Sequence, residues 1–290
     1  MKELIVTQKY NNKKLSTFLF NSFPDLKQST LYKALRKKDI RVNDIKISEN
    51  IILHSNDNIK VFICDDLLYS KFNLDIIYED NNVIVINKPS GIEVTGNNSL
   101  SSKLQEYSHS FAMPCHRIDR NTTGLVLFAK NEESLNILLD KFKNREIKKT
   151  YIATVYGIPD KKNNRLEAYL FKDNKKSLVY ISDVPKKGYL NIITSYSVIS
   201  EDLKKNTSTL KVNIETGRTH QIRAHLAHIG HPIIGDGKYG INKINKKFNR
   251  TTQMLCSFSL EFCFSTPSGI LEYLNGKVIN LKYMIKETIN

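Results

Sequence analysis

The chain has few of the patterns that mark metal-binding, secreted or membrane proteins. It contains four cysteines, and no two of them have the C-x-x-C spacing of a zinc knuckle or a thioredoxin-type redox site. No apolar run approaches the roughly 18 residues that span a bilayer. The first residues lack the basic-then-apolar layout of a signal peptide. We therefore expect reduced thiols, no membrane partner and a soluble protein of the cytoplasm.

Positive charge, by contrast, is abundant. The 290 residues include 44 Lys and Arg against 29 Asp and Glu, a formal net charge of +15. Such an excess attracts polyanions, and RNA, DNA and acidic membranes all fit. The length exceeds one typical domain and suits two.

The positive charge of the first 65 residues is concentrated in residues 32–43. Apolar residues recur at helical spacing after Ser29, a plausible N-cap, and predict a helix that buries Leu31, Ala34 and Leu35. Basic side chains lie away from that face or in the strand that follows: Lys33, Arg36, Lys37 and Arg41. Such a surface suits phosphate contacts, and a merely solvated face is the alternative.

From residue 74 onward, runs with strand character outnumber helical ones. Six strands are predicted, at residues 74–78, 83–87, 125–129, 151–156, 210–214 and 258–264. One helix should follow Asn131 as its cap, and another should cover residues 219–229 and stop at Gly230. Many strands with few helices indicate an α+β domain on a largely antiparallel sheet.

Residues 116–125, His-Arg-Ile-Asp-Arg-Asn-Thr-Thr-Gly-Leu, form the most informative segment. Asp119 lies between two arginines and before a Thr-Thr-Gly turn and an apolar strand. It should stay ionised, because opposite charges within reach favour the charged form. Such a group suits nucleophilic or electrostatic work, and a structural ion pair is the alternative.

The segment HRIDRNTTGLVLFAK (116–130) resembles the catalytic-aspartate motif of the RluA family of pseudouridine synthases. Three further segments follow the family's order: YEDNNVIVINKPSGI (78–92), KKTYIATVYG (148–157) and GRTHQIRAHLAHIGHPIIGDGKYG (217–240). Four motifs in order are far more specific than one. The resemblance implies the pseudouridine synthase fold for residues 73–290, with a long mixed, largely antiparallel sheet and a central cleft.

Residues 1–65 resemble a small S4-type RNA-binding domain, and residues 66–72 read as a polar linker. This combination is similar to the branch of the family that acts on large-subunit (23S-type) ribosomal RNA. Transfer RNA remains the alternative substrate. We expect a monomer.

The resemblance also implies roles for individual residues. It assigns catalysis to Asp119, Tyr151 and Arg223, and substrate binding to Lys88, His116, Arg117 and Ile222, with a structural role as the alternative for Lys88. Asp119 would attack the base or the ribose, or abstract a ribose proton, and these choices stay open. Arg223 would keep Asp119 ionised, and Tyr151 would pack on the base. Arg117 would fill the gap left by the flipped base, with His116 supporting the flipped nucleotide. No cofactor is implied, since the isomerisation needs neither redox change nor external energy.

Two other readings compete with an enzyme of this family. Four histidines, His220, His225, His228 and His231, could bind zinc for a hydrolase, but no H-E-x-x-H pattern accompanies them, and we expect no metal. A non-catalytic RNA-binding protein on the same fold would have no reason to keep the three catalytic residues. The chain departs from the family pattern at Thr95, at residues 255–257 and in the basic stretch 242–250.

Overall fold

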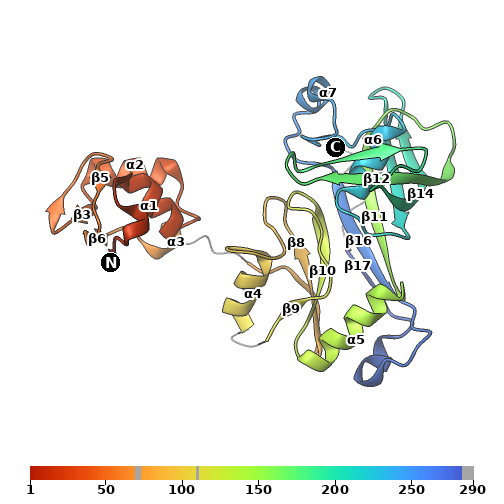
Figure 1. Ribbon diagram of the computed structural model, residues 1–290, viewed down its shortest axis with the longest axis horizontal. Helices are drawn as coiled ribbons and strands as arrows, with labels where there is room; N and C mark the ends of the chain where they lie inside the picture. Colours follow the sequence, from red (N-terminus) through yellow and green to blue (C-terminus); the bar gives the residue numbers. More distant parts are fainter. Residues whose placement is uncertain (69–72, 109–110, 283–290) are drawn as a thin grey trace. The chain divides into compact units, whose positions relative to one another are not determined.

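The computed structural model describes residues 1–68, 73–108 and 111–282, which form two compact units, Met1–Asn73 and Leu74–Asn290 (Figure 1). Of the expected linker, residues 66–68 belong to the short helix α3 (Asp65–Leu68), and Leu68 is buried in the core of the first unit. The rest of the linker, residues 69–72, lies outside the described residues.

The first unit packs two helices, α1 (Leu15–Ser22) and α2 (Gln28–Lys37), against short strands around one apolar core. One sheet has the order β1-β6-β3-β4, and β2 pairs with β5. These strands are β1 (Lys2–Ile5), β2 (Lys13–Lys14), β3 (Ile40–Val42), β4 (Ile45–Lys46), β5 (Ile52–Leu53) and β6 (Asn58–Val61).

Helix α2 buries the predicted face of Leu31, Ala34 and Leu35 and exposes its lysines and arginine. The capping role expected for Ser29 is wrong, because the helix begins one residue earlier, at Gln28. Its N-cap is Lys27, which has an extended backbone and follows the buried Leu26.

The turn between β3 and β4 shows how local chemistry sets a hairpin. Asn43 and Asp44 both have left-handed backbones, with φ of 49° and 67°. Two consecutive positive φ angles characterise the tight two-residue turn that matches the twist of paired strands, and Asn and Asp tolerate them. Lys60 adds an ion pair to Asp44 at 2.6 Å.

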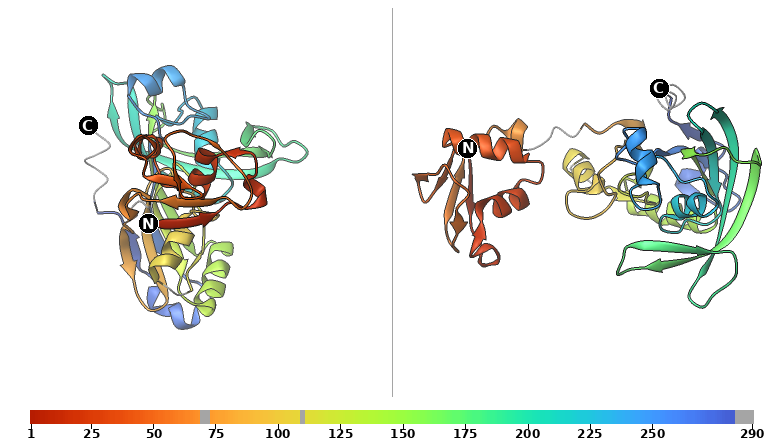
Figure 2. Two further views of the ribbon diagram at one scale, coloured as in Figure 1. Left: turned by 90° about the vertical axis from the view of Figure 1, so that its left-hand side faces the viewer. Right: turned by 90° about the horizontal axis from the view of Figure 1, so that it is seen from above.

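The second unit is built on an eleven-stranded sheet with the order β13-β12-β14-β15-β11-β16-β10-β8-β7, to which β17 and β9 add at β16 and β10. Its strands are β7 (Ile76–Glu79), β8 (Val83–Lys88), β9 (Met113–Pro114), β10 (Thr123–Ala129), β11 (Ile147–Tyr156), β12 (Asn163–Asp173), β13 (Leu178–Ser182), β14 (Leu190–Asp202), β15 (Thr207–Ile214), β16 (Leu255–Phe262) and β17 (Val278–Asn280). Views turned by 90° show how strongly this sheet twists (Figure 2). The expected α+β class and long mixed sheet are confirmed.

Among the described strands of this sheet, one pairing is parallel, that between β10 and β16. It begins beside Gly124, whose φ is +104°, and a Cβ atom there would lie 2.2 Å from the carbonyl oxygen of Ser257. The glycine after Thr122 and Thr123 therefore lets β10 and β16 approach closely. The chain segment that carries Asp119 leads directly into this point.

Two helices lie near opposite ends of the sheet of the second unit, α5 (Glu132–Lys143) and α6 (Gln221–His228) (Figure 1). Asn131 caps α5 as predicted, since its side chain accepts a hydrogen bond from the Ser134 N–H at 2.8 Å. Helix α6 falls inside the predicted range, and its N-cap, His220, has a left-handed backbone with φ of 53°. The second unit also contains α4 (Leu100–Ser108) and α7 (Asn242–Lys247).

Candidate active site

Asp119 lies on the loop between β9 and β10, just before the point where β10 pairs with β16. Its backbone carbonyl accepts a hydrogen bond from the Thr122 N–H at 3.0 Å, which closes a turn just before β10. The carboxylate retains 24% of its side-chain exposure. It is therefore held by its turn and still reachable by a ligand.

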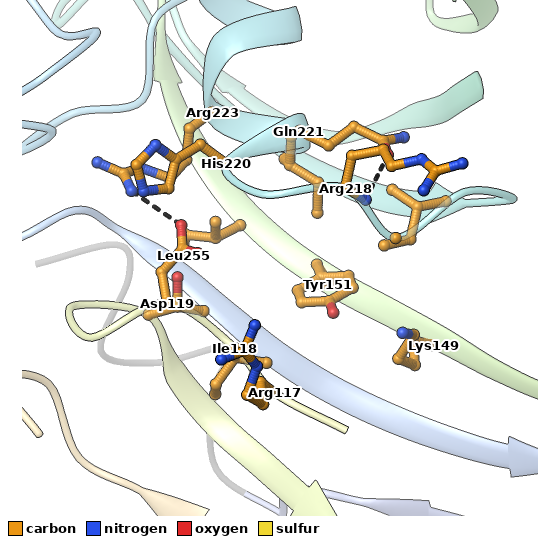
Figure 3. A pocket seen from close by; sticks show the side chains of 14 residues that line it. Arg117, Ile118, Asp119, Lys149, Tyr151, Arg218, His220, Gln221, Arg223 and Leu255 are labelled. Carbon is orange, nitrogen blue, oxygen red and sulfur yellow. Dashed lines mark hydrogen bonds and ion pairs between the residues drawn. The ribbon is translucent and has the colours of Figure 1, made fainter. Parts of the chain in front are cut away.

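Arg223, on α6, joins Asp119 to a second carboxylate. Its Nη1 donates to Asp119 Oδ2 at 2.8 Å, the contact drawn as a dashed line in Figure 3. Its Nε and Nη2 donate to the two oxygens of Asp236 at 2.7 and 3.0 Å. Asp236 is buried, and its carboxylate also accepts from the backbone N–H groups of Lys238 and Tyr239.

The two carboxylates therefore differ in availability. Burial alone would raise the pKa of Asp236, but the hydrogen bonds and charge of Arg223 lower it below its usual value. Asp236 uses both oxygens on partners, whereas Asp119 takes one hydrogen bond from Arg223 and faces the pocket. Asp236 thus holds the guanidinium in place, and the guanidinium aims Asp119.

Tyr239 supports the other side of this arrangement. Its ring centroid lies 5.3 Å from the guanidinium carbon of Arg223. Its hydroxyl accepts from the Val179 N–H at 2.9 Å and lies 2.8 Å from Nδ1 of His220. Arg223 is consequently fixed by two carboxylate contacts and an aromatic face, so its orientation does not depend on a ligand.

Tyr151, on β11, lies in the same pocket and is buried, with 5% exposure. Burial, followed by the negative charge of Asp119, raises the pKa of its hydroxyl. Tyr151 is therefore a neutral phenol at physiological pH. It offers an aromatic face together with one polar atom beside Asp119.

One pocket brings together five of the residues singled out from the sequence (Figure 3). It is lined by Asp119, Tyr151, Arg223, Arg117 and Ile222. Leu255 and Ile118 add apolar surface to it. Arg117 is exposed, whereas Ile222 is buried on α6. The pocket thus combines an ionised group, a phenol and apolar walls.

Of the two roles considered for Lys88, the contacts of its side chain favour the structural one over substrate binding. Its side chain is fully buried, and Nζ donates to the backbone carbonyls of Pro89, Ile92 and Arg120, each at 2.8 Å. Burial lowers the pKa of Lys88 to about 8, against the opposing effect of the Asp119 charge. With all three donors used inside the protein, Lys88 ties the loop after β8 to the Asp119 loop and has none left for RNA.

His116 lines the wider cleft next to the pocket. Its Nε2 accepts a hydrogen bond from the Leu127 N–H at 3.1 Å, and its ring packs on Phe142 with centroids 4.9 Å apart. Burial, and then the charge of Lys149, lowers the pKa of His116 well below its ordinary value. His116 is therefore neutral and carries its proton on Nδ1.

The four histidines considered as zinc ligands have separate partners. His225 contacts Thr194 at 3.0 Å, His228 contacts Asp183 at 2.8 Å and His231 contacts the Tyr156 carbonyl at 3.4 Å. His220 contacts Tyr239. Among the described residues, no group of three or more potential ligands is arranged to hold a metal ion. Within the same ranges, no helix has the length and apolar character to cross a bilayer.

Two functional residues had no role assigned to them from the sequence. Asp236 lies in the GDGKYG segment, where an aspartate between two glycines was a signal of a tight, specialised turn. Lys149 lies two residues before Tyr151, and the period of two along a strand indicates that both side chains share a face. The structure places both in the arrangement around Asp119.

Comparisons with known proteins identify the family of this chain. Residues 82–228 match the RNA pseudouridylate synthase family. The chain is 34% identical over 276 residues to the ribosomal large subunit pseudouridine synthase C of Buchnera aphidicola subsp. Acyrthosiphon pisum, covering 85% of each chain. It is 31% identical over 303 residues to an uncharacterized RNA pseudouridine synthase of Mycoplasma capricolum, covering 96% of this chain and 97% of the relative.

A likeness in structure points the same way. The human RNA pseudouridylate synthase domain containing 1 superposes with a TM-score of 0.59 at 23% identity, over 75% of this chain and 93% of that chain. At this identity the likeness shows the fold alone. Together with the family match and the relatives over most of their length, it leads to one conclusion: the chain belongs to the RNA pseudouridylate synthase family, of the RluA type, and is an isomerase that acts on RNA.

Proposed function

We propose that this chain converts specific uridines of large-subunit ribosomal RNA to pseudouridine by flipping the uridine out and acting on it with Asp119. One observation carries the proposal: Arg223, clamped by the buried Asp236, holds the reachable carboxylate of Asp119 beside Tyr151 in one pocket. The relatives named as ribosomal large subunit synthases support the choice of RNA.

The isomerisation breaks the bond from ribose to uracil N1, turns the uracil and rejoins it through C5. A site for it must hold a detached base, stabilise developing charge and take the proton from C5. Asp119 supplies the charge, and its ion pair with Arg223 at 2.8 Å orients the carboxylate. Asp119 would act by attacking the base or the ribose carbon, or by abstracting a ribose proton.

The pocket around Asp119 suits a flat, partly apolar base. Tyr151 would pack on one face of the uracil, and Ile222 would form the opposite wall. A uridine within folded RNA reaches this depth only after unstacking, at a cost of a few kcal/mol. Arg117, exposed at the mouth, would occupy the space that the base leaves, and His116 would support the flipped nucleotide.

The first unit would add affinity as an S4-type RNA-binding domain. Its α2 carries Lys33, Arg36 and Lys37 on the exposed side. Arg41 follows on β3, where its guanidinium lies 4.8 Å from the ring of Phe62. Exposed cations on a rigid helix suit contacts to RNA phosphates.

The replacement Asp119→Asn tests the proposal. It is nearly isosteric, so we expect a folded protein with at least a hundredfold loss of activity, measured as tritium released from RNA labelled at uridine C5. Asp140→Asn, on the exposed side of α5, is a matched control that should keep full activity. Activity of Asp119→Asn within tenfold of wild type, about 1.4 kcal/mol of barrier, would contradict the role of Asp119.

The substrate is tested separately. Transcribed ribosomal and transfer RNAs are each treated with the wild-type chain, and new pseudouridines are mapped. We expect modification of the large-subunit ribosomal RNA. Modification confined to transfer RNA would reject that substrate while leaving the role of Asp119 intact.

A further inference from the structure

Lys149 is a cation inside the catalytic cleft with no role so far. It lies on β11 two residues before Tyr151, and the two side chains leave the strand on the same side, toward the loop of Arg117 and Asp119 (Figure 3). Lys149 lines both the pocket of Asp119 and the wider cleft beside it. A ligand that enters this site therefore passes its ammonium group.

Among the described residues, no counterion pairs with the charge of Lys149. Its ammonium instead lies against the ring of Phe142, whose centroid is 5.3 Å from Nζ. Burial lowers its pKa. Other buried cations of this unit have polar partners: Lys141 pairs with Glu146 at 2.8 Å, Arg223 contacts two carboxylates, and Lys88 donates to three carbonyls. A half-buried ammonium without an anion costs free energy, which binding an anionic ligand would recover.

A second donor without an acceptor lies nearby. The Nδ1 atom of His116 is buried and has no hydrogen-bond partner in the described part of the chain, although the other ring nitrogen is satisfied by Leu127. The His116 ring and the Lys149 ammonium both pack on the ring of Phe142, at 4.9 and 5.3 Å from its centroid, and both residues line the same cleft. The Nδ1 atom of His116 is enclosed, so the ammonium of Lys149 is the donor of the two that an oxygen-rich anion can reach.

We propose that Lys149 binds one phosphate group of the RNA backbone next to the target uridine. This inference rests on the proposed function. The apolar walls and Tyr151 suit the uracil, whereas Lys149 also lines the wider cleft, where the backbone of a flipped nucleotide has to run. A lysine ammonium suits a phosphate as a compact point charge. The exposed Arg117 and Arg218 line the same cleft and increase its attraction for a phosphate.

The variant Lys149→Met tests the assignment, because methionine keeps the packing on Phe142 and removes the charge. The probe is a transcribed fragment of large-subunit ribosomal RNA that the wild-type chain modifies. We expect binding to weaken about tenfold or more, as for the removal of a charged hydrogen bond. The slope of log affinity against log salt should fall by about 0.7 to 0.9, the change expected when one phosphate is no longer neutralised. The variant Lys149→Arg should restore most of the affinity, because it restores the charge.

Lys148→Met is the matched control. Lys148 is the preceding residue of β11, its side chain is 61% exposed, and it lies 3.9 Å from Glu261. The change removes the same formal charge on the opposite face of the strand. We expect wild-type affinity and salt slope from this variant. An equal change in both variants would mean that only net charge matters, and would overturn the inference.

A substituted RNA locates the phosphate. Single phosphates around the modified uridine are replaced in turn by uncharged methylphosphonate. One position should weaken binding to wild type but not to Lys149→Met, since the two changes remove the same interaction. Additive losses at every position would overturn the phosphate assignment while the proposed function stands. A wild-type chain that modifies no RNA would overturn the proposed function and this inference with it.

Discussion

Buried polar side chains decide how this active site is organised at the scale of single residues. Arg223 is shared between Asp236, which is fully enclosed, and Asp119, which is not. Removing one partner of a buried ion pair leaves an uncompensated charge, which typically costs about 3 to 5 kcal/mol. Asp236 is therefore required for the position of Arg223 even though it does not line the pocket of Asp119.

The hydroxyl of Tyr151 can be tested apart from its ring. Tyr151→Phe keeps the aromatic face and removes the polar atom beside Asp119, so we expect unchanged RNA affinity and a single-turnover rate reduced at least a hundredfold. Filter binding and single-turnover kinetics separate the two effects. A rate near that of wild type would show that Tyr151 acts only as a wall of the pocket.

His225 gives the second unit a predictable response to acid. Burial, and then the charge of His228, lowers the pKa of His225 to about 4. Its pKa in the unfolded chain is about 6.5, so the folded state binds the proton less readily. The stability that this produces, up to about 3 kcal/mol, is complete above pH 6.5 and is lost as the pH falls toward 4.

Two measurements check this response. Histidine ring-proton NMR should show one residue that titrates near pH 4, and the free energy of unfolding of the second unit should fall between pH 6.5 and 4. The variant His225→Gln should flatten that fall. A His225 resonance that titrates near its ordinary pKa would contradict the expectation.

Helix α6 shows how one element positions several functional groups. Gln221, its first residue, accepts hydrogen bonds from Arg218 N–H and the Thr216 hydroxyl. Its amide nitrogen donates to the Ile193 carbonyl and to Thr194 on β14. The start of the helix is thereby fixed to the sheet, and Ile222 and Arg223 follow at once. This explains why a helix of eight residues can hold a catalytic geometry.

Helix α2 is expected to act through charge alone. Lys33, Arg36 and Lys37 are exposed on it, and none of them lines the pocket of Asp119. Replacing all three by Ala should lower the slope of log affinity against log salt by about 0.7 to 0.9 for each phosphate that the helix neutralises. The single-turnover rate at saturating RNA should barely change. An unaltered salt slope would mean that this face is merely solvated and would reject the S4-type reading of the first unit.

For the whole molecule, charge and length already indicated two units and a polyanionic partner. The excess of 15 positive charges is spread over a chain of two compact units, each with its own core. Hydrophobic clusters also pack on the large sheet of the second unit. Tyr151 and Ile222 belong to one of them, so the pocket of Asp119 is built on the core of this unit.

The strands of residues 163–202 were not predicted from the sequence, for a physical reason. Along β12 the first five positions are exposed or half-buried, and its buried residues, Ala168 and Leu170, are only two in eleven. A hairpin that faces solvent on much of its surface has little apolar alternation to detect. Backbone pairing with neighbouring strands, which the local sequence does not encode, stabilises it.

The sequence by itself indicated the family of this protein and the segments that carry the family's motifs. Asp119, Tyr151 and Arg223 stand in motifs whose order is specific, because each motif places a chemical group at a strand end, a strand face or a helix start. Only the tertiary structure decided which polar side chains have partners inside the protein. Lys88 is enclosed by carbonyls, Asp236 clamps Arg223, and Lys149 has no counterion within the described part of the chain, because burial and partners depend on segments that meet only in the folded protein.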